Sequence, residues 1–103
     1  MILQVTGRVD GETAAELERT CRQWITPSDR NLILDFGELQ YISSAGLSSI
    51  LGIGKEIDRQ GGQLLISGLS ERLKQTFMFS GFDTLFPVFE TAEAALTSCT
   101  GTP

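Results

Sequence analysis

Serine hydroxyls gather where a helix is expected to begin. Residues 39–51 read LQYISSAGLSSIL and place four serines within seven residues, Ser43, Ser44, Ser48 and Ser49. A serine at a helix start can serve in two ways. Its hydroxyl can accept a hydrogen bond from a free backbone amide and cap the helix, or it can be phosphorylated. The sequence therefore offers candidates for a cap and for a modification site in one short segment.

Two aspartates are positioned to lie near these hydroxyls. Asp10 precedes Gly11 at the end of one strand-like segment, and Asp35 comes at the end of another. Because the carboxyl ends of parallel strands meet at one edge of a sheet, we expect Asp10, Asp35 and the Ser43–Ser44 turn to share that edge. Two carboxylates could form an acid/base pair or bind a cation. Without further ligand residues we interpret them as turn and strand-end residues and predict no metal site.

The residues needed for catalysis are absent from this sequence. A serine nucleophile needs a base that takes its proton, but the chain has no histidine, and Lys55 lies about three turns down the helix from Ser44. The G-x-S-x-G elbow is missing. GIGK at residues 52–55 resembles the end of a Walker motif, but Ser49 and Glu56 replace its required glycine and hydroxyl residue. We predict that the protein is not an enzyme and needs no cofactor.

Composition limits the size, the partners and the location of the protein. A chain of 103 residues with 41% hydrophobic residues suits one folded domain, which we place at residues 1–99, with 100–103 as a tail. The net charge of −5 argues against direct nucleic-acid binding, because phosphate contacts need clustered basic residues. No apolar run suits a membrane span, and the N-terminus does not resemble a signal peptide. We expect a cytoplasmic protein without membrane insertion.

The two cysteines are expected to remain thiols. Cys21 continues an apolar helical stripe and is predicted to be a small core residue. Cys99 lies in a polar stretch near the C-terminus. A reducing compartment argues against a disulfide between them.

Strand-like and helix-like segments alternate along the chain. The pattern predicts strands near residues 2–9, 31–36, 63–67 and 85–89, and helices near 14–25, 44–59, 70–79 and from 91 onward. Thr13 and Glu16 fit a capping box, Pro27 is expected to end the first helix, and Pro87 makes the last strand an edge strand. Such alternation predicts an α/β fold, with a mainly parallel or mixed sheet of about four strands and about four helices.

The helix expected over residues 44–59 has one apolar side and one side of small residues. At 100° per residue, the exposed side begins with Ser44, Ala45, Ser48, Ser49 and Gly52. A glycine inside a helix costs about 1 kcal/mol relative to alanine, so Gly52 does not serve helix stability. A face of low relief allows close approach by another protein, and we expect a docking surface there. The alternative is an ordinary solvated helix face.

Three apolar residues farther along could extend that surface. They lie in and just after the third expected helix, at Met78, Phe79 and Phe82. Aromatic residues in such a helix more often belong to the core, and we predict that these three are core residues.

Several of these segments together resemble one known family. LDF at residues 34–36, followed by YISSAGL at 41–47, resembles the signature of STAS domains, in particular of anti-sigma factor antagonists. GRVD at residues 7–10, with the Thr-Ala pair at 13–14, resembles another family element. The C-terminal half is similar too, in Gly68-Leu69, Phe82, Leu85-Phe86 and Ala94-Ala95-Leu96. The resemblance covers almost the whole chain and implies a STAS-like single domain.

The resemblance implies a function in bacterial signal transduction that phosphorylation controls. In the family, the phosphoacceptor stands two residues before the Gly-Leu pair, which corresponds to Ser44 and leaves the capping role to Ser43. The unmodified antagonist binds an anti-sigma factor serine kinase and frees a sigma factor. The phosphorylated form is released, and a phosphatase restores it. The predicted partner-binding residues are Asp10, Asp35, Ser43, Ser44, Ala45, Ser48 and Gly52.

Two departures from the family pattern keep an alternative open. The residue before the phosphoacceptor is often Asp, and here it is Ser43. Many members also have a strand before the one that begins near Ile2, so this chain is either a shortened member or has a sheet edge that a partner covers. The alternative function is a STAS accessory subunit of a transporter or stress-signalling assembly. A third interpretation, weak nucleotide binding, lacks a phosphate loop.

Overall fold

The computed structural model describes residues 1–26 and 31–100, in which a four-stranded parallel sheet is combined with five helices. The strands lie in the order β1-β2-β3-β4, so each strand pairs with the next one along the chain. The predicted α/β fold is confirmed. The elements are β1 Ile2–Val9, α1 Ala14–Trp24, β2 Leu32–Ile42, α2 Ser44–Arg59, β3 Leu64–Ser67, α3 Glu71–Ser80, α4 Phe82–Leu85, β4 Val88–Phe89 and α5 Ala92–Thr100.

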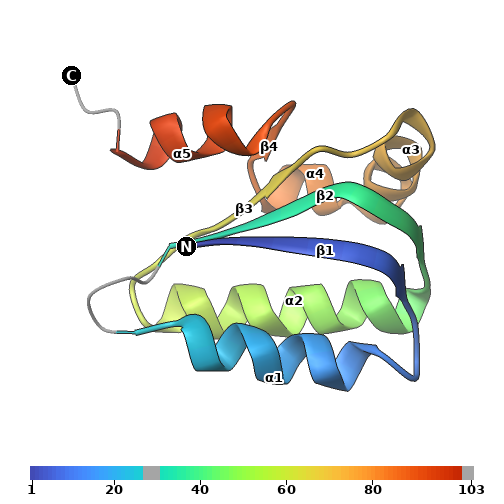
Figure 1. Cartoon of the computed structure of the whole chain (residues 1–103), viewed down its shortest axis with the longest axis horizontal. Coiled ribbons are helices and arrows are strands. Elements are labelled where there is room, and N and C mark those ends of the chain that lie inside the picture. Colours follow the sequence, from blue (N-terminus) through green and yellow to red (C-terminus); the bar gives the residue numbers. More distant parts are fainter. Residues whose placement is uncertain (27–30, 101–103) are drawn as a thin grey trace.

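Helices cover both faces of the sheet. α1 and α2 lie side by side on one face, and α5 lies on the other (Figure 1). The larger core cluster includes Ile50 of α2 and Phe77 of α3, both fully buried. A smaller cluster joins α5 to the sheet through Ile33, Leu65 and Ala95. The central strands are therefore buried on both faces, as is typical of a parallel sheet.

β2 is longer than the sequence predicts. We expected a strand over residues 31–36, and the observed strand continues to Ile42. Its pairing with β1 shifts register twice within Gln4–Arg8, each time with an extra residue on β2. Such bulges break the alternation of buried and exposed side chains, which is why the segment GELQYI does not resemble a strand in the sequence.

The strand expected over residues 85–89 is wrong in its first part. The chain forms α4 up to Leu85, and β4 contains only two residues. Gly81 separates α3 from α4 with φ 81°, a conformation that favours glycine. The rings of Phe82 and Phe86 then pack edge to face, because one helical turn brings residues four apart to the same side. β4 lies at an edge of the sheet, as Pro87 predicts.

The predicted helix ends agree with the structure in part. Ser43 and Ser70 cap α2 and α3 through side-chain bonds to amides of their first turns. Thr13 makes no such bond to α1, so the predicted capping box with Glu16 is wrong. The expectation that Pro27 ends the first helix lies outside the described residues, as do residues 101–103 of the predicted tail. The domain boundary after residue 99 stays a prediction.

Candidate functional site

The carboxyl ends of β1 and β2 meet where α2 begins, at one end of the sheet (Figure 1). The Ser43 N–H donates a hydrogen bond to Val9 O at 2.9 Å and joins the two strand ends. Gly46 lies against the same point: a Cβ there would be 2.7 Å from Val9 O and 2.8 Å from Ile42 Cγ1. Glycine therefore allows α2 to begin this close to β1. The sequence places Gly46 only on the inner helix face, although a glycine within a helix often has such a packing role.

The two serines at the start of α2 have different environments. Ser43 Oγ accepts a hydrogen bond from Gly46 N–H at 3.2 Å, and its backbone is extended, so the predicted capping role of Ser43 is confirmed. Ser44 is the first helical residue and is exposed. Its hydroxyl makes no hydrogen bond within the described part of the chain. The amides of Ser44 and Ala45 have no acceptor within the helix, so this hydroxyl lies at the positive end of the helix dipole.

Asp10 lies at the end of β1, beside the Ser43 turn, as the sequence predicts. Its Oδ1 accepts hydrogen bonds from Glu12 N–H at 3.0 Å and Thr13 N–H at 3.3 Å, and its Oδ2 lies 3.6 Å from Arg8 Nε. The bond from Glu12 is the largest cause that lowers the pKa of Asp10. Thr13 and Arg8 lower this pKa further, while partial burial opposes them. The Asp10 carboxylate is therefore stabilised in its charged form next to Ser43.

Arg8 and Thr13 hold this corner together in a way that the sequence does not reveal. Thr13 Oγ1 accepts a hydrogen bond from Asp10 N–H at 2.9 Å and donates one to Arg8 O at 3.0 Å. The Arg8 guanidinium carbon lies 4.5 Å from the centre of the Tyr41 ring. Arg8 therefore connects the ends of β1 and β2. Its contact with Tyr41 depends on the register shifts of β2, for which the sequence carries no clear signal.

Asp35 is not brought to this corner, and the expectation that it shares an edge with Asp10 and Ser44 is wrong. It lies inside β2, seven residues before Ile42, which is roughly 20 Å along a strand. Its Oδ1 accepts a hydrogen bond from Gly37 N–H at 3.0 Å. The error follows directly from the unexpected length of β2. A role of Asp35 in partner binding stays a prediction, without the support of proximity to Ser44.

The exposed side of α2 is narrower than expected because one of its serines is buried. Ser49 is 3% exposed, and its Oγ lies 3.1 Å from Ala14 O and 2.9 Å from Glu18 Oε1. The expectation that Ser49 is exposed is wrong, since α1 covers it and its hydroxyl bonds across the helix pair. We call the remaining small residues, which are exposed as expected, the α2 outer face: Ser44, Ala45, Ser48 and Gly52.

The prediction that Met78, Phe79 and Phe82 are core residues is confirmed for Phe82 and wrong for the other two. Phe82 is buried, and its ring centre lies 5.7 Å from that of Phe77. Met78 and Phe79 are exposed, Phe79 to 92%. α3 buries Leu73 and Phe77, which stand four residues apart and share one helix side. Met78 and Phe79 follow this stripe by one and two residues, so they point away from the core.

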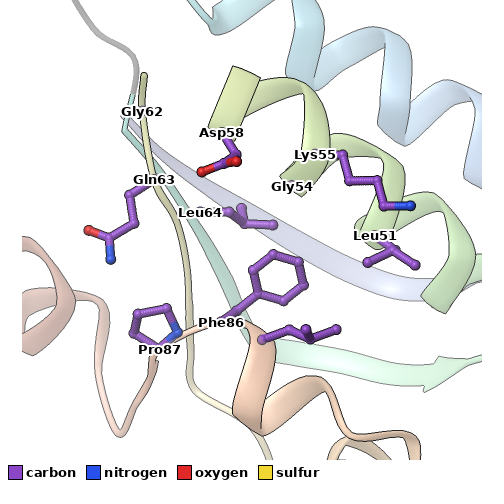
Figure 2. Close-up of a pocket in the computed structure, with 10 residues that line it drawn as sticks. Leu51, Gly54, Lys55, Asp58, Gly62, Gln63, Leu64, Phe86 and Pro87 are labelled. Carbon is purple, nitrogen blue, oxygen red and sulfur yellow. The ribbon is translucent and has the colours of Figure 1, made fainter. Parts of the chain in front are cut away.

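A pocket of about 420 Å³ lies farther along α2, between this helix and the segment that joins α4 to β4. Figure 2 shows the Phe86 ring beside the Leu64 side chain, facing α2. A Cβ at Gly54 would lie 2.4 Å from Phe86 Cε1, so glycine lets this ring pack against the helix. The amine of Lys55 and the carboxylate of Asp58 point in different directions (Figure 2), and they do not converge on a common ligand position.

Other side chains that could bind a metal ion or take part in a reaction are buried or lie far from one another. Within residues 1–26 and 31–100, no group of three or more His, Cys, Asp or Glu residues could hold a metal ion. In the same part of the chain, no helix has the length and apolar character needed to cross a membrane. Cys21 is fully buried, which confirms it as a core residue, and Cys99 is half-buried; both are free thiols.

Comparison with known proteins assigns the family. The model of the STAS domain family matches residues 1–95. The chain belongs to the STAS domain family. BtrV of Bordetella bronchiseptica, whose name describes a proposed anti-sigma factor antagonist, is 35% identical over 95 residues, which are 92% of this chain and 82% of BtrV. The anti-sigma-B factor antagonist of Staphylococcus aureus is 28% identical over 91 residues, which are 88% of this chain and 84% of that protein.

A solved structure agrees with the fold of this STAS protein. The Bacillus cell fate determinant SpoIIAA, in its phosphorylated form, has a TM-score of 0.71 at 20% identity, over 95% of this chain and 88% of SpoIIAA. Identity at this level shows the fold alone. With the sequence relatives, the family match identifies a STAS domain protein of the anti-sigma factor antagonist family. Such antagonists are non-enzymatic STAS proteins, which confirms the prediction that this chain is not an enzyme.

Proposed function

We propose that this STAS protein is an anti-sigma factor antagonist that works by partner switching. Its unmodified form binds an anti-sigma factor that is also a serine kinase, phosphorylation of Ser44 ends this binding, and a phosphatase restores the unmodified form. The observation that carries the proposal is the exposed Ser44 hydroxyl on the first turn of α2, beside free helix amides. Relatives named as anti-sigma factor antagonists support this class of partner.

The start of α2 is well suited to carry a phosphate without loss of the fold. A phosphoserine brings about −1.5 to −2 charges at neutral pH, and a helix N-terminus offers free amides and a partial positive charge. The first turn of α2 contains no acidic residue that would repel the phosphate. The existence of a phosphorylated SpoIIAA structure with a similar fold supports this argument. Modification of Ser44 is therefore expected to leave the domain folded.

The same phosphate would act strongly on a bound partner. The α2 outer face consists of small side chains, and Asp10 and Ser43 border it at the strand ends. A protein docked on this face would bury the Ser44 side chain. A dianion that is buried without a paired cation is costly, and Asp10 adds negative charge at the border. Phosphorylation should therefore expel the partner by charge and desolvation rather than by a change of shape.

Calorimetric titration with the cognate anti-sigma factor kinase tests the proposal. Ser44→Glu places a carboxylate at the phosphorylation site and should weaken binding about 100-fold or more, as expected for a buried unpaired charge. Ser98→Glu is the matched control, because Ser98 is exposed on α5, on the other side of the sheet. Ser98→Glu should bind like the unmodified protein. Equal binding by all three proteins would contradict partner switching and favour a permanent accessory role.

Phosphopeptide mapping after reaction with this kinase and ATP tests the acceptor itself. Phosphate is expected on Ser44 and should be absent from Ser44→Ala. Ser43→Ala should still be modified, because Ser43 serves as the cap. Phosphate found only on Ser43 would overturn the assignment.

A further inference from the structure

The α2 outer face is too small to hold another protein by itself. It consists of the side chains of two serines and an alanine and of the backbone at one glycine. A stable protein–protein interface covers about 800 Å² and about 20–30 residues on each partner. A protein docked on this face must therefore also contact the surface on one side of α2 or the other.

Different elements border the two sides of α2. Ser49 bonds to Ala14 O and Glu18 of α1, whereas Gly54 lies against the Phe86 ring, which follows α4. Five residues turn an α-helix by roughly 140°. The segment after α4 therefore borders α2 on the side away from α1.

The α1 side of α2 is polar. Its charged groups pair with each other, Glu18 with Arg22 and Glu56 with Arg59. A hollow of about 400 Å³ on this side is lined by one apolar and three polar residues. The exposed Trp24 ends α1 at the opposite end of the helix pair from the start of α2 (Figure 1). Because charged residues are depleted in the core of an interface, this side offers little to a partner.

The other side of α2 is apolar and hollow. The pocket of about 420 Å³ lies there, and its lining includes Leu51, Leu85 and the Phe86 ring. Leu85 is 57% exposed. Leu51 stands three residues after Ser48 and directly before Gly52, so it lies beside the α2 outer face on the helix surface. We call this hollow the α2–α4 pocket, and it is continuous with the α2 outer face.

Lys55 places an unpaired positive charge at the same pocket. It lines the pocket and is exposed, and its amine makes no ion pair within residues 1–26 and 31–100. Figure 2 shows the amine pointing toward Leu51 and away from Asp58. The amine is therefore available to a carboxylate of another protein.

We propose, on the basis of the proposed function, that the anti-sigma factor kinase anchors itself in the α2–α4 pocket. It inserts an apolar side chain between Leu51, Leu85 and Phe86 and sets a carboxylate against Lys55. Binding energy in interfaces is concentrated in a few side chains that fill pockets, while the contacts around them are nearly neutral. The pocket thus supplies most of the affinity, and the small side chains of the α2 outer face allow the close approach that makes binding sensitive to a phosphate on Ser44.

Calorimetric titration of the whole chain with the same kinase tests the anchor. Leu85→Ser removes apolar surface at the pocket and should raise the dissociation constant about tenfold, as expected for an interface anchor. Lys55→Gln removes the charge and should raise it about threefold, with a weaker dependence on salt. Leu96→Ser is the matched control, because Leu96 is exposed on α5 on the other face of the sheet, and it should bind like the unchanged chain.

The outcomes separate a failed anchor from a failed switch. If Leu85→Ser and Lys55→Gln bind like the unchanged chain while Ser44→Glu does not, the anchor is overturned and partner switching stands. If the pocket variants bind weakly and Ser44→Glu binds normally, the switch is overturned and the anchor stands. Circular dichroism shows whether Leu85→Ser still folds, and Lys55→Gln decides if it does not. Sedimentation equilibrium of the chain alone should show no self-association that Leu85→Ser abolishes, because such a dimer would place a second copy in the pocket and overturn the proposal.

Discussion

Neighbouring serines at the start of α2 differ in what their hydroxyls contact, and this difference should be measurable as stability. Ser43→Ala removes the bond to Gly46 N–H and should lower the free energy of unfolding by about 1 kcal/mol. Ser44→Ala removes an exposed hydroxyl and should change it by less than about 0.5 kcal/mol. Urea denaturation of both variants makes the comparison. Equal losses would show that Ser44 also has a structural role.

Residue roles could be predicted from the sequence where they depend on local structure. The capping role of Ser43 could be predicted from its position at the helix start, and the place of Asp10 from a strand that ends before Gly11. The assignment of Ser44 as phosphoacceptor comes from the family resemblance and stays a prediction. Asp35 was misplaced because its location depends on how far β2 continues. The contact of Arg8 with Tyr41 depends on register shifts between strands, which no local pattern encodes. At the scale of single residues, the sequence did not predict the contacts between residues of different elements.

At the scale of the element, α2 contains two glycines whose replacement should have opposite effects. A Cβ at Gly52 meets no heavy atom within 4 Å, while a Cβ at Gly54 would lie 2.4 Å from the Phe86 ring. Gly52→Ala should stabilise the protein by up to about 1 kcal/mol, the helix propensity gain. Gly54→Ala should destabilise it by about 1–2 kcal/mol, because overpacking outweighs the same gain. Thermal unfolding of the two variants provides the test, and a stabilised Gly54→Ala would mean that Phe86 moves freely.

The elements themselves were predictable where one periodicity runs without interruption. α2 follows a 3.6-residue pattern over its whole length, and β3 is an unbroken apolar run, so both were located nearly to the residue. The strand predicted over residues 31–36 was shorter than β2, because the bulges of β2 interrupt the two-residue period. α4 was missed because Phe82–Leu85 makes a single turn that aromatic packing stabilises, and one turn is too short for a helical pattern. Ser49 was placed on the wrong side of α2 because its hydroxyl is satisfied by α1.

At the scale of the whole molecule, the α2 outer face depends on the packing of the domain beneath it. Gly46 holds the start of α2 against Val9 at the end of β1, because a Cβ at Gly46 would lie 2.7 Å from Val9 O. Global stability thus underlies the proposed function, and its dependence on pH can be predicted from one buried group.

Cys21 should make the whole fold sensitive to alkaline pH. Burial, helped by the negative charge of Glu18, raises the pKa of the Cys21 thiol from 9.0 to about 12. Below pH 9 the thiol is protonated in both the folded and the unfolded chain, so it does not affect their balance. Between pH 9 and 12 the unfolded chain releases this proton and the folded chain retains it, so the free energy of unfolding should fall as pH rises, by at most about 1.4 kcal/mol per pH unit.

The matched variant for this effect is Cys21→Ala, which removes the titrating thiol and leaves every other side chain in place. Urea denaturation at pH 8 and pH 10.5 should show a larger loss of stability for the unchanged chain than for Cys21→Ala. The difference arises because the unchanged chain has a buried thiol that ionises when the chain unfolds at pH 10.5, and Cys21→Ala has no such group. Any packing that Cys21→Ala loses lowers its stability at both pH values, so it does not affect this comparison. Identical losses in the two proteins would mean that Cys21 ionises in the folded state, and that the core around α1 admits water.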